Sequence, residues 1–228
     1  MDVLAVVAES GTKGDQQAMG EAVVGTAARC PGTGLEMSVI TAATAASLGS
    51  CPFEVHIRAS ATETAIIPGV DLDGDTDLVL HCAVCRAHAP AVYGPPAAEV
   101  FGPVPADRVG AAMVSQLQWA LEHANATYAI LNACRALRFA DDGQLCAKLD
   151  GGHWYLAHHG ANSWCDHGAR AVLDSPVHRA EPTLSIAAPS EVSMSTGSSD
   201  GRPDGGFFHG TGFAGSYLLF FDQGRSFS

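Results

Sequence analysis

Three short apolar segments in the first part of the chain predict β-strands, at residues 3–7, 35–40 and 53–57. The first segment, VLAVV, is uninterrupted and rich in β-branched residues, which is typical of a strand buried on both faces of a sheet. Between the first two strands, a Gly- and Ala-rich stretch at 16–29 predicts a helix. The pattern therefore begins as strand, helix, strand, strand.

The hydrophobic pattern further along the chain is mostly helical. Residues 76–89 carry apolar side chains at helical spacing, and the Pro-rich stretch 94–105 interrupts any helix and predicts a domain boundary. Beyond it, residues 107–124 and 127–140 each show the apolar stripe of an amphipathic helix, with Asp107 a candidate N-cap. The short connection between these two helices predicts an antiparallel pair.

The end of the chain has a different composition. From about residue 190 it is rich in Ser and Gly and shows no hydrophobic period, so we expect a loose, disordered tail. Its apolar end, YLLFF at 217–221, has no evident partner in the sequence. No internal repeat is visible.

The composition and charge narrow the classes of function. Of 228 residues, 47% are apolar and 16% charged, enough for one or two globular domains with a buried core. The net charge of −12 argues against a nucleic-acid surface and favours a cationic ligand. No segment approaches the roughly 18 to 20 consecutive apolar residues of a membrane span, and no basic region precedes the first apolar run. We expect a cytoplasmic monomer that binds no membrane.

The cysteine pattern favours free thiols over a disulfide framework. Seven cysteines, an odd number, stand at 30, 51, 82, 85, 134, 146 and 165. Within HCAVCRAH, the side chains of His81, Cys82, Cys85 and His88 could supply metal ligands, because their spacing follows one helical face. A second cysteine pair at matching spacing is missing, so we favour a plain apolar helix face over a structural zinc site.

Two carboxylates form the first candidate chemical group. A strand that begins at Asp2 and a strand carrying Glu36, joined across a helix, would place these side chains near each other at one edge of a small sheet. Such pairs hold Mg²⁺ through hard oxygen ligands, and the metal then bridges the phosphates of a substrate. The competing interpretation is that both carboxylates are solvated at strand ends.

Two cations form the second candidate group. Arg135 ends a helical stripe, and Lys148 follows after a polar turn. The sharper interpretation is a pair of cations that reaches a polyphosphate, since Arg offers a planar fork and Lys a compact charge. The competing interpretation is that Arg135 is solvated and Lys148 lies on the surface. Because Lys13 is the only other lysine, the sequence favours the sharper interpretation slightly.

At these residues the sequence resembles a known family. The order MDVLAVV, LEMSVI, FEVHI and TDLVLH, then GPPAAEVFGPVP and the block from LNACR to AKLDGGHW, is similar to the aminoglycoside (3'')(9) adenylyltransferases. These enzymes modify streptomycin and spectinomycin. The likeness runs from residue 1 to about 175, and its most specific pieces are the proline-rich connector and the final block.

The resemblance implies an α+β fold, in which a nucleotidyltransferase-like small mixed sheet with helices is followed by an α-helical bundle. It divides the chain into a nucleotidyltransferase domain at 1–93, a connector at 94–105 and a helical domain at 106–180. Residues 181–228 are then a disordered tail. ATP, bound with Mg²⁺, and the antibiotic are expected in the cleft between the two domains.

The resemblance also implies roles for individual residues. Asp2 corresponds to the second aspartate of the family's metal-binding Asp-x-Asp pair, and Glu36 to the base that deprotonates the antibiotic hydroxyl. Arg135 and Lys148 correspond to the contacts with the nucleotide phosphates. The family's acidic substrate contact falls at Asn125, which lacks a negative charge.

The sequence departs from the family in two further places. The tryptophan that stacks on the antibiotic has no counterpart in VHIRASAT at 55–62, and Met1 stands where the residue before the second aspartate belongs. We therefore expect an N-terminally truncated domain that holds Mg²⁺ poorly. Two functions follow: transfer of AMP from Mg-ATP to a hydroxyl of an aminoglycoside-type antibiotic or, alternatively, a catalytically inactive remnant that keeps only the helical binding domain.

Overall fold

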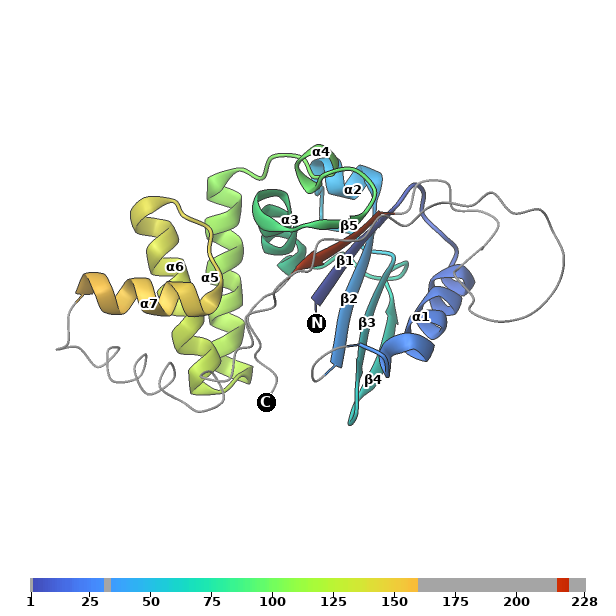
Figure 1. The fold of residues 1–228 in the computed structure, drawn as a ribbon, viewed down its shortest axis with the longest axis horizontal. Helices are drawn as coiled ribbons and strands as arrows, with labels where there is room; N and C mark the ends of the chain where they lie inside the picture. The colour runs from blue at the N-terminus through green and yellow to red at the C-terminus, as the bar shows by residue number, and fades with distance from the viewer. Residues whose placement is uncertain (1, 31–33, 160–216, 222–228) are drawn as a thin grey trace, which may run out of the picture.

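The computed structural model describes residues 2–30, 34–159 and 217–221. Its strands form one six-stranded mixed sheet (Figure 1). The strands, in chain order, are β1 Asp2–Val7, β2 Gly34–Thr41, β3 Val55–Ser60, β4 Thr64–Pro68, β5 Ala91–Tyr93 and β6 Tyr217–Phe221. The helices are α1 Lys13–Ala27, α2 Ala42–Ser47, α3 Asp77–His88, α4 Ala97–Val100, α5 Ala106–His123, α6 Ala126–Asp142 and α7 Lys148–His159.

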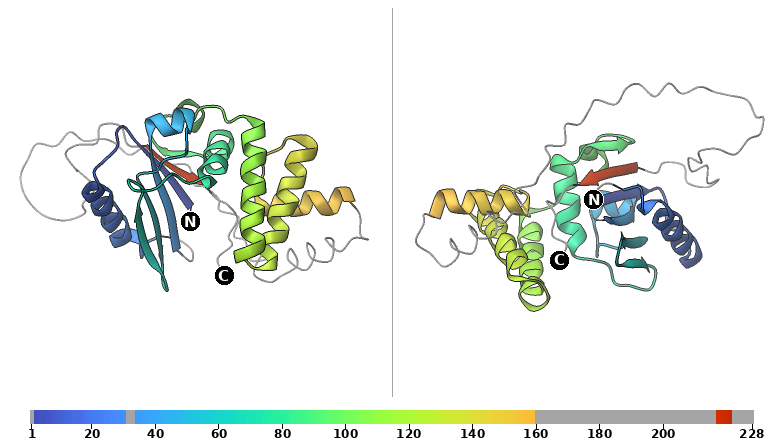
Figure 2. Two further views of the ribbon diagram at one scale, coloured as in Figure 1. Left: turned by 180° about the vertical axis from the view of Figure 1, so that it is seen from behind. Right: turned by 60° about the horizontal axis from the view of Figure 1, so that its bottom comes forward.

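The sheet has the order β4-β3-β2-β1-β6-β5. β1 and β2 run parallel, joined by the crossover helix α1, and every other neighbouring pair runs antiparallel. Helices α5, α6 and α7 follow as a separate group on one side of the sheet, with α3 between the sheet and α5 (Figures 1 and 2). The predicted α+β class, a small mixed sheet followed by a helical bundle, is confirmed.

Strand β1 is buried on both faces, as its continuous apolar run predicts. Val3, Ala5 and Val7 lie in one core with residues of α1, whereas Leu4 and Val6 lie in a second core with α3. Alternation along the strand therefore assigns even-numbered residues of β1 to the α3 face. Asp2 belongs to this face, the one nearer the helical group.

The helical group is closely packed where α6 meets α7. A Cβ atom added to Gly151 would lie 2.7 Å from the Cα atom of Arg135, a contact between main chains that no side chain there could relieve. The glycine in the AKLDGGHW block thus lets α7 approach α6 closely. This packing brings Lys148, the first residue of α7, toward Arg135 in α6.

One prediction about a helix start is wrong, and a second helix start has a cap that the sequence analysis did not name. Asp107 does not cap α5, which begins at Ala106 after Pro105 and has no side-chain cap; the carboxylate of Asp107 accepts from the backbone N–H of Arg108 instead. The fixed φ of Pro105 already favours helix entry one residue earlier. Asn125 is the N-cap of α6, because its Oδ1 accepts from the backbone N–H of Tyr128 at 2.9 Å.

The prediction that YLLFF has no partner is wrong. These residues form β6, which pairs antiparallel with β1 and lies between β1 and β5. The expected disorder of 181–228 otherwise lies outside the described residues, as does the predicted helical domain beyond residue 159. The proposed domain boundaries remain predictions.

The cysteines and the helices complete this picture. In the ranges that the structure describes, all cysteines are free, and burial raises the pKa of the Cys85 thiol to about 12, which keeps it protonated. Cys165 lies outside those ranges. None of the described helices is long and apolar enough to cross a membrane.

Candidate active site

The predicted carboxylate pair lies on adjacent strands. In the parallel register of β1 and β2, Asp2 is the direct partner of Glu36, and Glu36 faces Arg58 across the antiparallel pair β2 and β3. Because side chains alternate along a strand, these three residues share the α3 face of the sheet. The strand, helix, strand arrangement expected from the sequence thus brings the two carboxylates together at one end of the sheet.

A histidine that the sequence analysis did not single out lies beside Glu36. The Nδ1 atom of His56 is 2.9 Å from the hydroxyl of Ser38, and its Nε2 atom is 3.6 Å from Oε1 of Glu36. Burial lowers the pKa of His56, so the ring is neutral near pH 7. A neutral ring with its N–H toward Glu36 accepts the Ser38 hydroxyl at Nδ1.

The environment of Glu36 suits a proton acceptor. Burial raises the pKa of its carboxyl above the usual value, while the charges of Arg58 and Lys148 act in the opposite direction. Its side chain keeps a relative exposure of 32%, so a ligand can still reach it. A carboxylate with a raised pKa is a stronger base than one in water.

The two predicted cations lie deep in the helical group. Arg135 is only 2% exposed and Lys148 only 5%. Burial, followed by the charge of Arg135, lowers the pKa of Lys148 to about 8, whereas the carboxylates of Asp2, Asp77 and Glu36 raise it. Charged groups on β1, α3, β2 and α6 therefore all lie within electrostatic range of Lys148.

An aromatic ring supports the lysine. The ammonium of Lys148 lies 4.1 Å from the centre of the Tyr128 ring, within the range of a cation–π contact. Tyr128 also meets the exposed Trp119 edge to face, at 6.2 Å between ring centres. Tyr128 on α6 thus contacts Lys148, and Trp119 on α5 packs against the Tyr128 ring.

Asp77, the first residue of α3, is a further carboxylate of the site. Burial raises the pKa of its carboxyl, while a hydrogen bond from Gln116 and the charges of Lys148 and Arg135 act against this. In the sequence, Asp77 stands in TDLVLH immediately before a run of buried helical residues. An acidic residue at the start of a buried helix is the feature of the sequence that identifies Asp77.

Asn125 lies one turn of α6 before Tyr128, at the edge of this site. Its side-chain oxygen caps the helix, and the residue itself is exposed. The cap explains why an amide suits this position structurally. A contact with the acceptor substrate remains a prediction.

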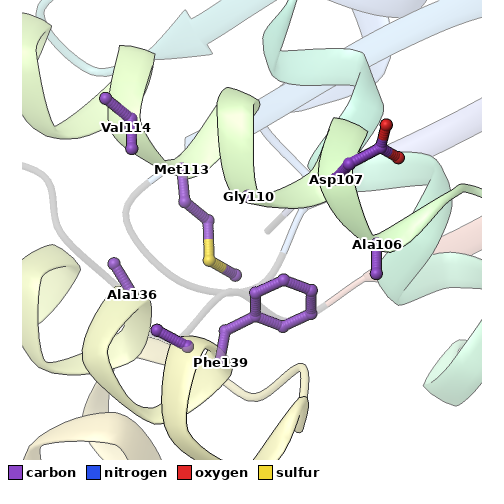
Figure 3. A pocket seen from close by; sticks show the side chains of 8 residues that line it. Ala106, Asp107, Gly110, Met113, Val114, Ala136 and Phe139 are labelled. Carbon is purple, nitrogen blue, oxygen red and sulfur yellow. The ribbon is translucent and has the colours of Figure 1, made fainter.

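A separate cavity of about 470 Å³ lies between α5 and α6 (Figure 3). Met113 and Phe139 form much of its apolar lining, and Asp107 stands at one end. None of the candidate catalytic or nucleotide-binding residues lines it. We therefore do not count this cavity as part of the candidate active site.

Residues 99–163 match the family described as "Aminoglycoside adenylyltransferase, C-terminal domain". Through this segment the chain is similar to the aminoglycoside adenylyltransferases. The match includes Asn125, Arg135 and Lys148, and it confirms the resemblance found in the sequence. No curated protein matches the chain.

A solved structure of spectinomycin adenyltransferase AAD(9) from Enterococcus faecialis, with ATP and spectinomycin, is similar in fold to this chain. The TM-score is 0.55 at 14% sequence identity, and the match covers 77% of this chain and 76% of the other. At this identity the likeness concerns the fold. The similarity in fold extends beyond the helical segment, because the match covers 77% of this chain.

Proposed function

We propose that the chain transfers AMP from ATP to a hydroxyl group of an aminoglycoside-type antibiotic. One observation carries the proposal: Asp2 and Glu36 are paired on adjacent strands, and both carboxylates act electrostatically on Lys148, in the segment that matches the adenylyltransferase C-terminal domain. Glu36 would serve as a base, and the positive charges of Arg135 and Lys148 would attract a triphosphate. Such a modification of an antibiotic is a means of resistance.

Glu36 is the proposed general base. It takes the proton of the acceptor hydroxyl as that oxygen bonds to the α-phosphorus and the bond to pyrophosphate breaks. Burial raises the pKa of Glu36 toward the operating pH, which favours proton transfer to its carboxylate. His56, whose pKa burial lowers, lies 3.6 Å from Oε1 and adds no full positive charge beside the carboxylate.

Arg135 and Lys148 are the proposed contacts with the phosphates. Charge accumulates on the leaving pyrophosphate as the bond to the α-phosphorus breaks, and fixed cations stabilise that charge without reorganising. The burial of both side chains strengthens their attraction for an anion, because the surroundings are less polar than water.

Mg²⁺ is part of the proposal through Asp2. Carboxylate oxygens suit this ion, and Mg²⁺ is commonly held by one or two carboxylates together with substrate phosphates and water. Among the described residues, no cluster of three His, Cys, Asp or Glu side chains could hold a metal, so the nucleotide would supply most ligands. When bound, the ion would neutralise phosphate charge.

The acceptor is proposed by analogy with the solved neighbour, whose structure contains spectinomycin. Aminoglycosides are cationic, which suits a chain with a net charge of −12. Spectinomycin and streptomycin are therefore the first acceptors to examine.

The test is direct transfer of AMP. The purified full chain, incubated with Mg-ATP and each antibiotic, should produce an AMP adduct detectable by mass spectrometry. Glu36→Gln should abolish the adduct, while Glu21→Gln, an exposed change on α1, should not. Failure of the wild-type chain to form an adduct with either antibiotic would favour the inactive remnant.

A further inference from the structure

Gln116 on α5 lies at the centre of a hydrogen-bonded chain that connects three helices. Its side chain is buried, at 5% exposure, and its Oε1 accepts a hydrogen bond from Nη2 of Arg135 at 2.5 Å. Burial raises the pKa of the Asp77 carboxyl, and hydrogen bonding from Gln116 is the largest influence that lowers it. One glutamine amide thus serves a cation on α6 and an anion on α3 at the same time.

A second amide fixes the same guanidinium. Oδ1 of Asn132 accepts from Nη2 of Arg135 at 2.9 Å, while Nδ2 of Asn132 donates to the backbone carbonyl of Tyr128 at 2.9 Å. Because its NH₂ group is engaged by a carbonyl, the oxygen of Asn132 must face the arginine. Two amides of defined orientation therefore hold one end of the Arg135 side chain.

The other end of this guanidinium has a donor without a partner. Nε of Arg135 is buried and makes no hydrogen bond within the described part of the chain. A buried donor left unpaired costs free energy, and native proteins rarely tolerate one without a reason. A ligand oxygen that accepts from Nε would remove this cost.

We propose that Gln116, anchored by Asp77, is a positioning residue that holds the Arg135 guanidinium ready for a phosphate oxygen of the nucleotide. The inference rests on the proposed function only in taking a polyphosphate as the ligand of Arg135. Gln116 itself touches neither substrate nor the reacting atoms. An apolar residue at position 116 would leave Asp77 and Arg135 without their shared partner.

The first experiment follows the guanidinium itself in the intact chain. The Nε–H proton of Arg135 in the wild type should give a nuclear magnetic resonance signal that exchanges slowly with water, because the group is buried and held. Gln116→Leu should broaden or remove this signal. Gln118→Leu, at an exposed glutamine on the same helix, should leave it unchanged.

The second experiment measures binding of inorganic tripolyphosphate by calorimetry. Gln116→Leu should weaken binding about tenfold, since a charged contact loses its alignment, whereas Gln118→Leu should not. Gln116→Glu alone places a second carboxylate beside Asp77, and the two negative charges repel each other. Adding Asp77→Asn supplies a donor to that glutamate at unchanged net charge and should restore the signal of the Arg135 Nε–H proton.

Each outcome has a defined meaning. Wild-type protein that does not bind tripolyphosphate, or a Gln116→Leu variant that binds it as well as wild type, overturns the inference. If Gln116→Leu fails to fold, the double variant, which retains every hydrogen bond, decides by rescue or its absence. If Gln116→Leu shows the predicted loss of binding but the wild-type chain transfers no AMP, the inference stands and the proposed function is rejected.

Discussion

Glu54 and Arg135 are both buried charged side chains, at 6% and 2% exposure, yet their hydrogen bonding differs. The Glu54 carboxylate accepts from the hydroxyl of Ser10 at 2.9 and 3.1 Å, from the backbone N–H of Gly11 at 2.8 Å and from Nε2 of Gln16 at 3.0 Å. Arg135 keeps one donor without a partner in the described residues. A buried charge with complete hydrogen bonding serves the fold, and an incompletely bonded one is available to a ligand.

In both regions a buried glutamine side chain hydrogen bonds to the charged group. Gln16 on α1 donates to Glu54 and accepts from the backbone N–H of Val70 at 3.3 Å, so it connects α1 to the residue before β3 and to the segment after β4. Gln116 similarly bridges Asp77 and Arg135. The difference lies in the charged group that each glutamine supports, because only Arg135 retains hydrogen-bonding capacity.

The largest expected effect tests the structural side of this comparison. Glu54→Gln replaces one acceptor oxygen by an NH₂ group that faces donors, and it should lower the free energy of unfolding by about 3 kcal/mol. Chemical denaturation measures this value, with Glu21→Gln at an exposed position as the control. Equal stability of both variants would show that the Glu54 network contributes little to the fold.

Whether a contact in these regions could be predicted from the sequence depends on how far apart its partners lie along the chain. The strand, helix, strand pattern was enough to predict that Asp2 and Glu36 lie together, because one crossover joins their strands. Arg135 and Lys148 were identified from charge pattern and family likeness.

The hydrogen-bonding partners were not predictable in the same way. Gln116 meets Asp77 only because α5 packs against α3, and β6 joins β1 only through pairing over most of the chain length. His56 could have been found from strand alternation, since it lies on the same face as Arg58, the residue opposite Glu36. Contacts of this kind depend on tertiary packing, which local periodicity does not encode.

The next effect concerns the ligand side of the comparison. Lys148→Ala should weaken ATP binding by roughly ten- to a hundredfold, or about 1.5 to 3 kcal/mol, because a charge-assisted phosphate contact is lost. Lys13→Ala, at an exposed lysine paired with Asp71 at 2.5 Å, is the matched control. We expect Asp2→Ala to weaken binding less than Lys148→Ala, and calorimetry showing the reverse order would identify the metal site as the stronger determinant.

A smaller effect follows from the lowered pKa of Lys148, about 8. As the pH rises through this value the free protein loses the ammonium charge, so ATP affinity should fall by up to about tenfold per pH unit. The same group affects folding with opposite sign. Its pKa in the fold lies below that of an unfolded lysine, so its contribution to stability rises between about pH 8 and 10.5.

The measurement compares ATP titrations from pH 6.5 to 9 in the wild type and in Lys148→Met. The variant should bind more weakly throughout and lack the alkaline decline. Arg135, Asp2, Asp77 and Glu36 are the charged groups that act on Lys148 and remain in both proteins. An unchanged alkaline decline in Lys148→Met would assign the titration to another group.

The smallest effect is expected at Asn125, whose side-chain oxygen is engaged like the carboxylate of Glu54. Asn125→Ala removes the cap of α6 and should lower the free energy of unfolding by about 1 kcal/mol. Asn125→Asp keeps a capping oxygen and adds a negative charge near the helix N-terminus, so it should retain full stability. If Asn125 serves the fold alone, neither change alters the affinity for a cationic antibiotic. Tighter antibiotic binding by Asn125→Asp would instead support the predicted substrate contact, and it would show that a satisfied polar group in this chain can also meet a ligand.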